Sequence, residues 1–348
     1  MRIIDAGDFD AHWRNRNEAA SVGGAVENEA VDRTVRDIIE AVQKDGDRAV
    51  RDYASRFDRS SPEKLEVPVE AAREAWETFR RDEGELAAAL ELAAVHIRRF
   101  AELQRKQFVP FENEMAAGLF AGQQVIPVER AAVYIPAGRF PLFSSVLMGM
   151  IPAQAAGVDE LILASPPMEN GLPDRRILAA AALAADLTAG GKTGSHARPR
   201  IFAVGGAQAI AALALGTETV PRVDVIAGPG NKYVAAAKRL LFGQVGIDFV
   251  AGPTDVLIIV AGGPADSAHT AAAIVAADMC AQAEHDPDAR ARALVPGPEA
   301  AEKLAAALEE QLAALPESSR LAAASSLEAG GLIIVYRSRE EAIRIANI

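Results

Sequence analysis

The sequence predicts an α/β protein made of two Rossmann-like, three-layer α/β/α domains that follow an N-terminal helical segment. The first observation is that, from about residue 130, short Val- and Ile-rich runs alternate with helical stretches of about ten residues. This alternation is typical of a parallel sheet covered by helices on both faces. The second observation is that another series of the same kind begins at residue 256. Two successive series imply two doubly wound domains with a cleft between them.

Residues 1 to about 107 are expected to be helical. In "VRDIIEAVQKDGDRAVRDYASRF" (35–57) and "EGELAAALELAAVHIRRFAELQRKQ" (83–107), apolar residues recur at helical spacing. The Asp45-Gly46-Asp47 triplet predicts a break between two helices, because glycine flanked by aspartates favours a turn.

The first α/β series begins with "AAVYIP" and the second with "VLIIV". In the first series, strands are expected at 131–136, 160–165, 200–204 and 223–227, and helices at 144–157, 177–187, 207–215 and 233–242. In the second series, strands are expected at 256–260, 292–295 and 332–336, and helices at 268–283, 301–315 and 339–348.

Composition excludes several classes of protein. The net charge of −12 argues against a nucleic-acid partner, which would require a basic face. The single cysteine, Cys280, excludes an internal disulfide framework and suits a reducing compartment. The N-terminus has no apolar signal core, and no uncharged apolar run is long enough to span a membrane. We therefore expect a cytoplasmic protein without a membrane segment.

Three glycine-containing loops follow strands of the first series. They are "PAGRFPLFSS" (136–145), "GGAQA" (205–209) and "GPGNKY" (228–233). Loops after parallel strands meet at one edge of the sheet, where glycine permits close backbone approach and helix N-termini offer N–H groups to a pyrophosphate. None is a complete G-x-G-x-x-G motif, and each alone is equally consistent with a tight turn. The three together favour a nucleotide or other anion site.

A dense set of polar groups lies in "MCAQAEHDPDA" (279–289). If the helix extends to 285, Asp278, Gln282 and His285 share one face, while Cys280 and Glu284 point elsewhere. An imidazole with nearby oxygen ligands suits zinc, but two ligands are too few for a closed site. The alternative is a helix C-terminus with His285 at the negative end of the helix dipole. Spacing alone favours that alternative.

Several long motifs, in order, closely resemble histidinol dehydrogenase. They are "VYIPAGRFPLFSSVLMGMIPAQAAGV", "VGGAQAIAALALGTETVPRVDVIAGPGNKYVAAAKRL", "GIDFVAGPTDVLIIV" and "AQAEHDPDA". The likeness extends from the helix pair near 34–58 to the end of the chain. It implies oxidation of L-histidinol through the aldehyde to L-histidine, with reduction of two NAD, in histidine biosynthesis.

The resemblance also implies site residues. Tyr134, Gln208 and Asn231 correspond to residues that contact NAD in the family, and Gln282 and His285 to residues that bind zinc and substrate. Thr254 corresponds to a serine that contacts substrate. In the family, zinc holds the amine and imidazole of the substrate and orients its alcohol carbon toward the nicotinamide.

The family fold resembles that of aldehyde dehydrogenases, and the family assembly is a homodimer. The resemblance implies an N-terminal arm at 1–25, a discontinuous first α/β domain at 26–134 and 254–348, and an NAD-binding α/β domain at 135–253.

The sequence departs from the family at the expected substrate pocket. The family motif "AGPSE" is "AGPTD" here, with Thr254 and Asp255, and "PAGRF" places Ala137 and Arg139 where "PGG" is usual. A guanidinium at a substrate mouth pairs with acidic groups, although Arg139 is equally consistent with a phosphate contact to NAD or a solvated loop. These changes leave open a relative that oxidises another amino alcohol or an acidic alcohol.

The family also has a motif resembling "APEHLE", whose Glu-His pair supplies the general base, and a later Asp and His that complete the zinc shell. We expect this last part of the family fold, with its catalytic pair, to lie beyond Ile348. A general base must lie within hydrogen-bond reach of the proton that it takes. The 348-residue chain is therefore expected to bind NAD better than it turns over, and a non-catalytic nucleotide-binding protein is the alternative.

Overall fold

The computed structural model describes residues 1–348 except 138–140, 190–198, 251–254, 262–267 and 286–288. Within helices, it also leaves undescribed the side chains of 14–28, 186–189, 268–270, His285 and Ser318. Contacts between Cα atoms divide the chain into two compact units. Unit 1 comprises Met1–Glu27 and Gly252–Ile348, and unit 2 comprises Asn28–Ala251.

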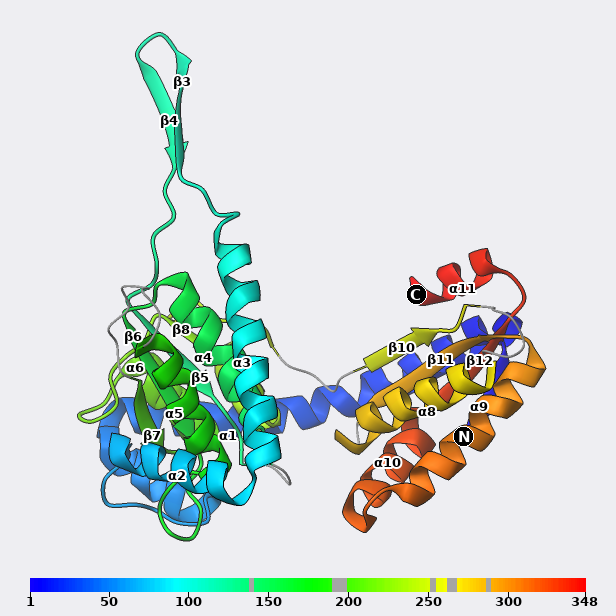
Figure 1. Ribbon diagram of the computed structural model, residues 1–348, viewed down its shortest axis with the longest axis horizontal. Helices are drawn as coiled ribbons and strands as arrows, with labels where there is room; N and C mark the ends of the chain where they lie inside the picture. The colour runs from blue at the N-terminus through cyan, green and yellow to red at the C-terminus, as the bar shows by residue number, and fades with distance from the viewer. Residues whose placement is uncertain (138–140, 190–198, 251–254, 262–267, 286–288) are drawn as a thin grey trace. The chain divides into compact units, whose positions relative to one another are not determined.

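Unit 2 is built around a six-stranded sheet with the strand order β2-β7-β6-β5-β8-β9 (Figure 1). The strands are β2 (Glu66–Val67), β5 (Arg130–Tyr134), β6 (Glu160–Ser165), β7 (Arg200–Ala203), β8 (Val225–Ala227) and β9 (Gly246–Ile247). Every pairing is parallel except that of β2 with β7. The central strands are buried on both faces, which explains why they are continuously apolar instead of alternating with polar residues.

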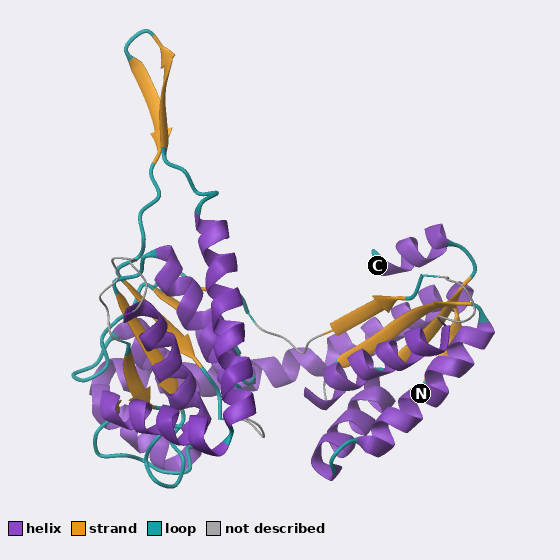
Figure 2. Cartoon of the chain, in the orientation of Figure 1, coloured by secondary structure: helices purple, strands orange, loops and turns teal. Residues whose placement is uncertain are grey.

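Helices cover both faces of this sheet (Figure 2). They are α1 (Phe9–Phe57, in unit 2 from Asn28), α2 (Val69–Asp82), α3 (Gly84–Arg105), α4 (Phe143–Ala156), α5 (Arg175–Ala189), α6 (Gly206–Leu215) and α7 (Lys232–Leu241). Side chains of a strand alternate between faces. Accordingly, Ala132 and Tyr134 pack with α1, α6 and α7, whereas Ala131 and Val133 pack with α2, α3, α4 and α5. These two cores establish a three-layer α/β/α arrangement.

Unit 1 has a four-stranded parallel sheet in the order β1-β12-β11-β10. The strands are β1 (Arg2–Asp5), β10 (Asp255–Ile259), β11 (Arg290–Pro296) and β12 (Leu332–Tyr336). The helices are η1 (Ala6–Asp8), the start of α1, α8 (Ala268–His285), α9 (Pro298–Ala314), α10 (Glu317–Gly330) and α11 (Arg339–Ala346). Ile333 and Val335 face α8, α9 and α10, whereas Leu332 and Ile334 face η1, Phe9 and α11.

The α/β prediction is confirmed, and the predicted strands and helices after residue 130 are present. Elements that the sequence analysis missed are β1, α10 and the antiparallel hairpin of β3 (Phe111–Ala116) and β4 (Leu119–Gln123). The expectation that residues 1–107 are entirely helical was therefore wrong at β1 and β2. Both strands are very short, so neither shows a repeating pattern.

The unit boundaries differ from the predicted domain boundaries. The prediction groups 26–134 with 254–348, whereas the contacts group 28–134 with 135–251. The physical reason is that β5 lies in the middle of the six-stranded sheet and pairs with β6 on one side and β8 on the other. Among the described residues, no helix is both long and apolar enough to cross a membrane.

The predicted break between two helices is confirmed at Gly46. Its backbone angles (φ 53°, ψ −131°) are not helical, and they divide α1 into two straight parts. Asp47 then fixes the second part to the loop between α6 and β8, because its carboxylate accepts hydrogen bonds from the hydroxyls of Thr217 and Thr219. The Asp47 backbone N–H in turn donates to the carboxylate of Glu218 (2.8 Å).

Candidate functional site

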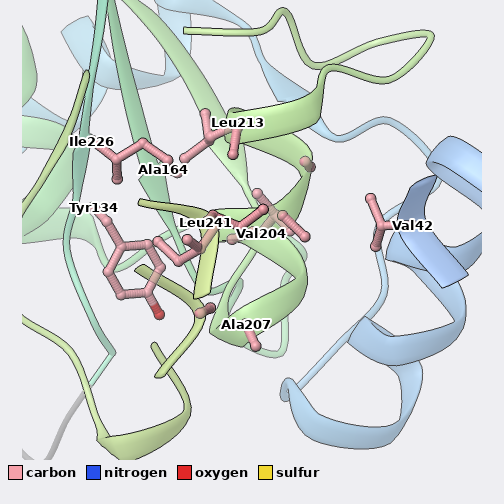
Figure 3. Packing of buried hydrophobic residues seen from close by; sticks show 14 of the residues in the cluster. Val42, Tyr134, Ala164, Val204, Ala207, Leu213, Ile226 and Leu241 are labelled. Carbon is pink, nitrogen blue, oxygen red and sulfur yellow. The ribbon is translucent and has the colours of Figure 1, made fainter. Parts of the chain in front are cut away.

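The three loops predicted to meet at one sheet edge do meet there. They follow β5, β7 and β8, whose carboxyl ends lie at the same edge because these strands run parallel. The Tyr134 hydroxyl oxygen at the end of β5 accepts a hydrogen bond from the Gly206 N–H (3.0 Å). Figure 3 shows this hydroxyl directed toward the start of α6, beside Ala207.

The third loop closes against the same tyrosine through Gly228. This residue has a φ of +126°, and a Cβ built on it would lie 2.0 Å from the Tyr134 carbonyl oxygen. Both facts require glycine, since a side chain would be strained and would collide with the backbone. Tyr134 is thus the point at which the loops after β5, β7 and β8 contact one another.

The N-terminus of α7 is capped by its own chain. The Asn231 side-chain oxygen accepts hydrogen bonds from the N–H groups of Tyr233 (3.0 Å) and Val234 (3.1 Å). At α6, the Gly206 N–H is engaged by Tyr134. The sequence analysis expected free N–H groups for a pyrophosphate at these two helices, whereas protein side chains engage the N–H groups named here.

A carboxylate that the sequence analysis did not identify lies at the start of α6. Asp58 follows the end of α1, and its Oδ2 atom accepts a hydrogen bond from the Gln208 side-chain Nε2 (3.4 Å). Burial raises the pKa of Asp58 from 3.8 to about 6, although hydrogen bonds from the Gly205 N–H and the Gln208 amide lower it. Burial, together with the nearby Asp58, also raises the pKa of the Tyr134 hydroxyl, so it remains a neutral hydroxyl.

Two of the predicted NAD-contacting residues, Gln208 and Asn231, line one cavity of about 300 Å³ in unit 2. The cavity is lined by Thr34, Ile38, Phe57, Gly206, Ala207, Gln208, Asn231 and Tyr233. Gln208 is only 1% exposed, so its amide forms part of an inner wall. Phe57 and Tyr233 supply exposed aromatic surface. The cavity therefore combines two amides with two aromatic rings, which is a composition suited to an organic ligand with ring systems.

A buried ion pair braces the loop that follows β8. The ammonium of Lys238, a residue that is 1% exposed, contacts the Asp248 carboxylate and donates to the Gly228 carbonyl oxygen (3.0 Å). The other carboxylate oxygen of Asp248 accepts the Gly228 N–H (2.8 Å). Because both charges would be costly to leave unpaired, this arrangement fixes the loop that carries Asn231.

The helix predicted to carry metal ligands is present as α8, which ends at His285. Asp278 is exposed and Gln282 is partly buried, whereas Cys280 lies in the apolar core of unit 1. Burial, together with Glu284, raises the pKa of the Cys280 thiol, which disfavours the thiolate that a metal or an electrophile would need. The side chain of His285 lies outside the described residues.

Within the described part of the chain, no group of three or more His, Cys, Asp and Glu side chains is arranged to hold a metal ion. Gln282 and His285 offer an amide oxygen and an imidazole from adjacent turns of one helix, and imidazole nitrogen and side-chain oxygen both suit zinc. These two residues fit zinc chemically, but they supply fewer donors than the four-coordinate shell needs.

Comparison with known proteins places this geometry in a family. A family model described as "Histidinol dehydrogenase" matches residues 23–348. The chain belongs to the histidinol dehydrogenase family. Members of this oxidoreductase family named histidinol dehydrogenase include a Streptococcus mutans serotype c protein, 41% identical over 323 residues, which covers 92% of this chain and 69% of the relative. An Aquifex aeolicus protein is 40% identical over 349 residues, covering 100% and 75%.

The fold agrees with that of a solved family member. The crystal structure of histidinol dehydrogenase from Elizabethkingia anophelis matches with a TM-score of 0.77 and 32% sequence identity. The match covers 90% of this chain and 67% of that chain. Since the identity is spread over both units, the two α/β sheets described above are those of a histidinol dehydrogenase.

Of the departures from the usual family sequence, Asp255 has a structural explanation. It begins β10, and its carboxylate accepts a hydrogen bond from the guanidinium of Arg292 on β11 (2.9 Å). Arg292 is buried and also lies over the Trp13 ring, 5.2 Å from its centroid. The carboxylate at 255 is therefore engaged in holding two strands together. Thr254 and Arg139 lie outside the described residues.

Sequence reasoning missed Asp58, Phe57 and Tyr233 as residues of the candidate site. Tyr233 follows Asn231 closely and could have been found from the "GPGNKY" loop. Asp58 lies 150 residues from Gln208, its hydrogen-bond partner, and the surrounding "RFDRSSP" has only the polar composition of an ordinary loop. No periodic signal in the sequence marks that contact.

Proposed function

We propose that this protein oxidises L-histidinol through histidinal to L-histidine with NAD as the electron acceptor, as a step of histidine biosynthesis. Membership of the histidinol dehydrogenase family supports the reaction. The observation that carries the nucleotide site is the convergence of three loops on Tyr134, with Gln208 and Asn231 in the wall of one cavity.

In this proposal unit 2 is the NAD-binding domain, and the amides of Gln208 and Asn231 contact the cofactor. The described residues fit such a ligand, because the cavity has polar amides and exposed aromatic surface at the carboxyl edge of a parallel sheet. When bound, NAD supplies the hydride acceptor. Tyr134 acts by holding the loop after β7, since its hydroxyl oxygen is engaged by Gly206. Asp58 orients the Gln208 amide through its carboxylate.

We further propose that Gln282 and His285 supply two ligands to zinc, and that Thr254, Gln282 and His285 contact the substrate. The family relationship and the adjacent positions of the first two on α8 support this assignment. Zinc, when bound, supplies a Lewis acid that fixes a substrate amine or imidazole. The remaining ligands, and the Glu-His general base, are expected from elsewhere in the protein.

The proposal is tested by measuring NAD binding and histidinol-dependent NADH formation on the same preparations. We expect Asn231→Ala to raise the dissociation constant for NAD by about tenfold, the cost of about one charged or well-placed hydrogen bond. In a chain that turns over, His285→Asn should abolish NADH formation while leaving NAD affinity unchanged. Full activity of His285→Asn would remove its ligand role. Turnover of an acidic or sulfonated alcohol, with none of histidinol, would replace the proposed substrate.

The protein is also proposed to act as a cytoplasmic homodimer. The homodimer follows from the family resemblance, and the cytoplasm from a single cysteine that is buried and free in this structure. Gel filtration with light scattering checks the assembly, and a monomer at micromolar concentration would contradict it.

A further inference from the structure

The β3–β4 hairpin of unit 2 has no partner within the described chain. Residues 107–129, here called the arm, are exposed throughout, and β3 and β4 pair only with each other. Figure 1 shows the hairpin extending away from the six-stranded sheet beyond the end of α3. A lone two-stranded hairpin is marginally stable in water at best, and both of its edges present unpaired backbone groups. The arm therefore needs a surface against which to pack.

The arm presents far more apolar surface than a connection exposed to water needs. Its exposed large apolar side chains are Phe108, Val109, Phe111, Met115, Leu119, Phe120, Val125, Ile126 and Val128. The outer face of α3 continues this surface with Leu92, Val95, Phe100 and Leu103, which share one side of the helix. Contiguous exposed apolar patches of this extent mark interaction sites on soluble proteins.

A groove lies at the base of the arm, between the C-terminal ends of α3 and α4. It has a volume of about 420 Å³ and is lined mainly by apolar residues. They include Ala101, Phe108, Pro110, Val125, Pro127 and Pro152. Such a concave apolar surface accepts a projecting side chain of the kind that the tip of the arm carries at Leu119 and Phe120.

Charges on the arm and on α3 are opposite in sign. The arm contains Glu112, Glu114 and Glu129 and no Lys or Arg, whereas the end of α3 and the residue after it carry Arg99, Arg105 and Lys106. Among the described side chains, Glu112 and Glu114 form no ion pair, and neither do the three basic residues. A surface that carries both an acidic arm and a basic helix end is complementary to a second copy of itself.

Self-complementarity is what a two-fold dimer requires, since each patch meets the other patch twice. The apolar area is sufficient as well. A fully buried aromatic side chain removes about 150–250 Å² from water, so these half-exposed residues offer on the order of 1,000 Å² per copy, above the roughly 800 Å² per partner of a standard interface.

We propose that the arm is a dimerisation element, which packs along α3 of a second copy and places its tip in the groove at the base of that copy's arm. The inference rests on the homodimer proposed above and assigns its surface. Each arm then supplies Glu112 to the basic end of α3 in the other copy, and receives the same contact in return.

Sedimentation velocity at micromolar concentration tests the interface. We expect the wild-type chain to be a dimer, and Phe120→Glu to raise the dimer dissociation constant by about 100-fold, the effect of losing an apolar anchor and burying an unpaired charge. The matched control is Phe242→Glu, on the exposed end of α7 (69% exposed, against 60% for Phe120), which should leave the dimer intact. Circular dichroism confirms that both variants are folded.

Charge reversal gives a second, independent measurement. Glu112→Arg and Arg105→Glu should each weaken self-association by about tenfold, because each places like charges opposite one another. A mixture of the two variants should form a heterodimer of wild-type affinity, since every reversed charge then meets its opposite.

A monomeric wild-type chain, a dimer unaffected by Phe120→Glu, or equal dissociation by Phe242→Glu would each overturn the proposal. Failure of the proposed function is separately visible: NAD affinity measured on the same samples would then be lost in a chain whose dimer depends on the arm as expected.

Discussion

At the scale of single residues, the candidate nucleotide site depends on a carboxylate that is distant in the sequence. Asp58 holds the amide of Gln208, and Tyr134 holds the N–H of Gly206, so two buried polar groups fix the start of α6. Sequence could predict Tyr134, Gln208 and Asn231, because each stands at a fixed place after a recognisable strand. It could not predict Asp58, because a long-range contact from a loop leaves no periodic pattern.

The raised pKa of Asp58 has a consequence for stability. Between an unfolded value near 3.8 and a folded value of about 6, the folded chain retains a proton that the unfolded chain has released. The free energy of unfolding should therefore fall as pH rises through this window. Asp58→Asn, which is permanently neutral, should gain stability over the wild type by about 1–3 kcal/mol between pH 4 and pH 6, and no more above it.

Urea unfolding of both chains at several pH values gives this difference directly. Other carboxyl groups titrate equally in the two chains, so they cancel in the subtraction. A difference that stays constant from pH 4 to pH 7 would show that Asp58 does not carry the shift.

At the scale of elements, the strands and helices of residues 130–260 were predictable because burial on both sheet faces makes each strand a continuous apolar run. The β3–β4 hairpin was not predictable in this way. All of its residues are exposed, so no burial requirement shapes its sequence. Helix α10 was missed because its Ser-rich sequence has weak helical propensity, and packing on α8 and β11 supplies its stability.

The break in α1 provides an element-scale prediction. At Gly46, with φ +53°, an added Cβ would lie 2.3 Å from a carboxylate oxygen of Glu218. Gly46→Ala should therefore lower the free energy of unfolding by about 1–3 kcal/mol. Gly84→Ala, at the first residue of α3 with no atom within 4 Å, is the matched control and should be neutral or stabilising. Thermal unfolding of both variants decides, and equal melting temperatures would contradict the strain at Gly46.

At the scale of the whole molecule, the two-lobe α/β architecture was predictable from the repeated strand–helix series, but the division of the chain was not. The partition of residues 28–134 depends on which sheet β5 joins, and that is decided by pairing between distant strands. The cores show the result, since the two clusters of unit 2 contain only residues from 31 to 245.

A fragment of residues 28–251 should therefore fold by itself. It contains both cores of unit 2 and the complete 300 Å³ cavity. We expect it to unfold cooperatively and to bind NAD within about threefold of the affinity of the whole chain, as a self-sufficient domain would. Calorimetry of the fragment and the whole chain checks both points. A fragment without a cooperative transition would show that unit 2 needs unit 1.

The pairing of β1 with β12 constrains the order in which the chain acquires structure. Ile3 lies opposite Ile333 in the sheet of unit 1, so the first strand to leave the ribosome finds its neighbour only when synthesis is nearly complete. At about 5–20 residues per second, that interval is roughly 15–70 s. During this time the continuous stretch of unit 2 has everything it needs to collapse. Its early maturation would leave the opening strand waiting, and any partner able to accept an orphan β-edge would have its opportunity then.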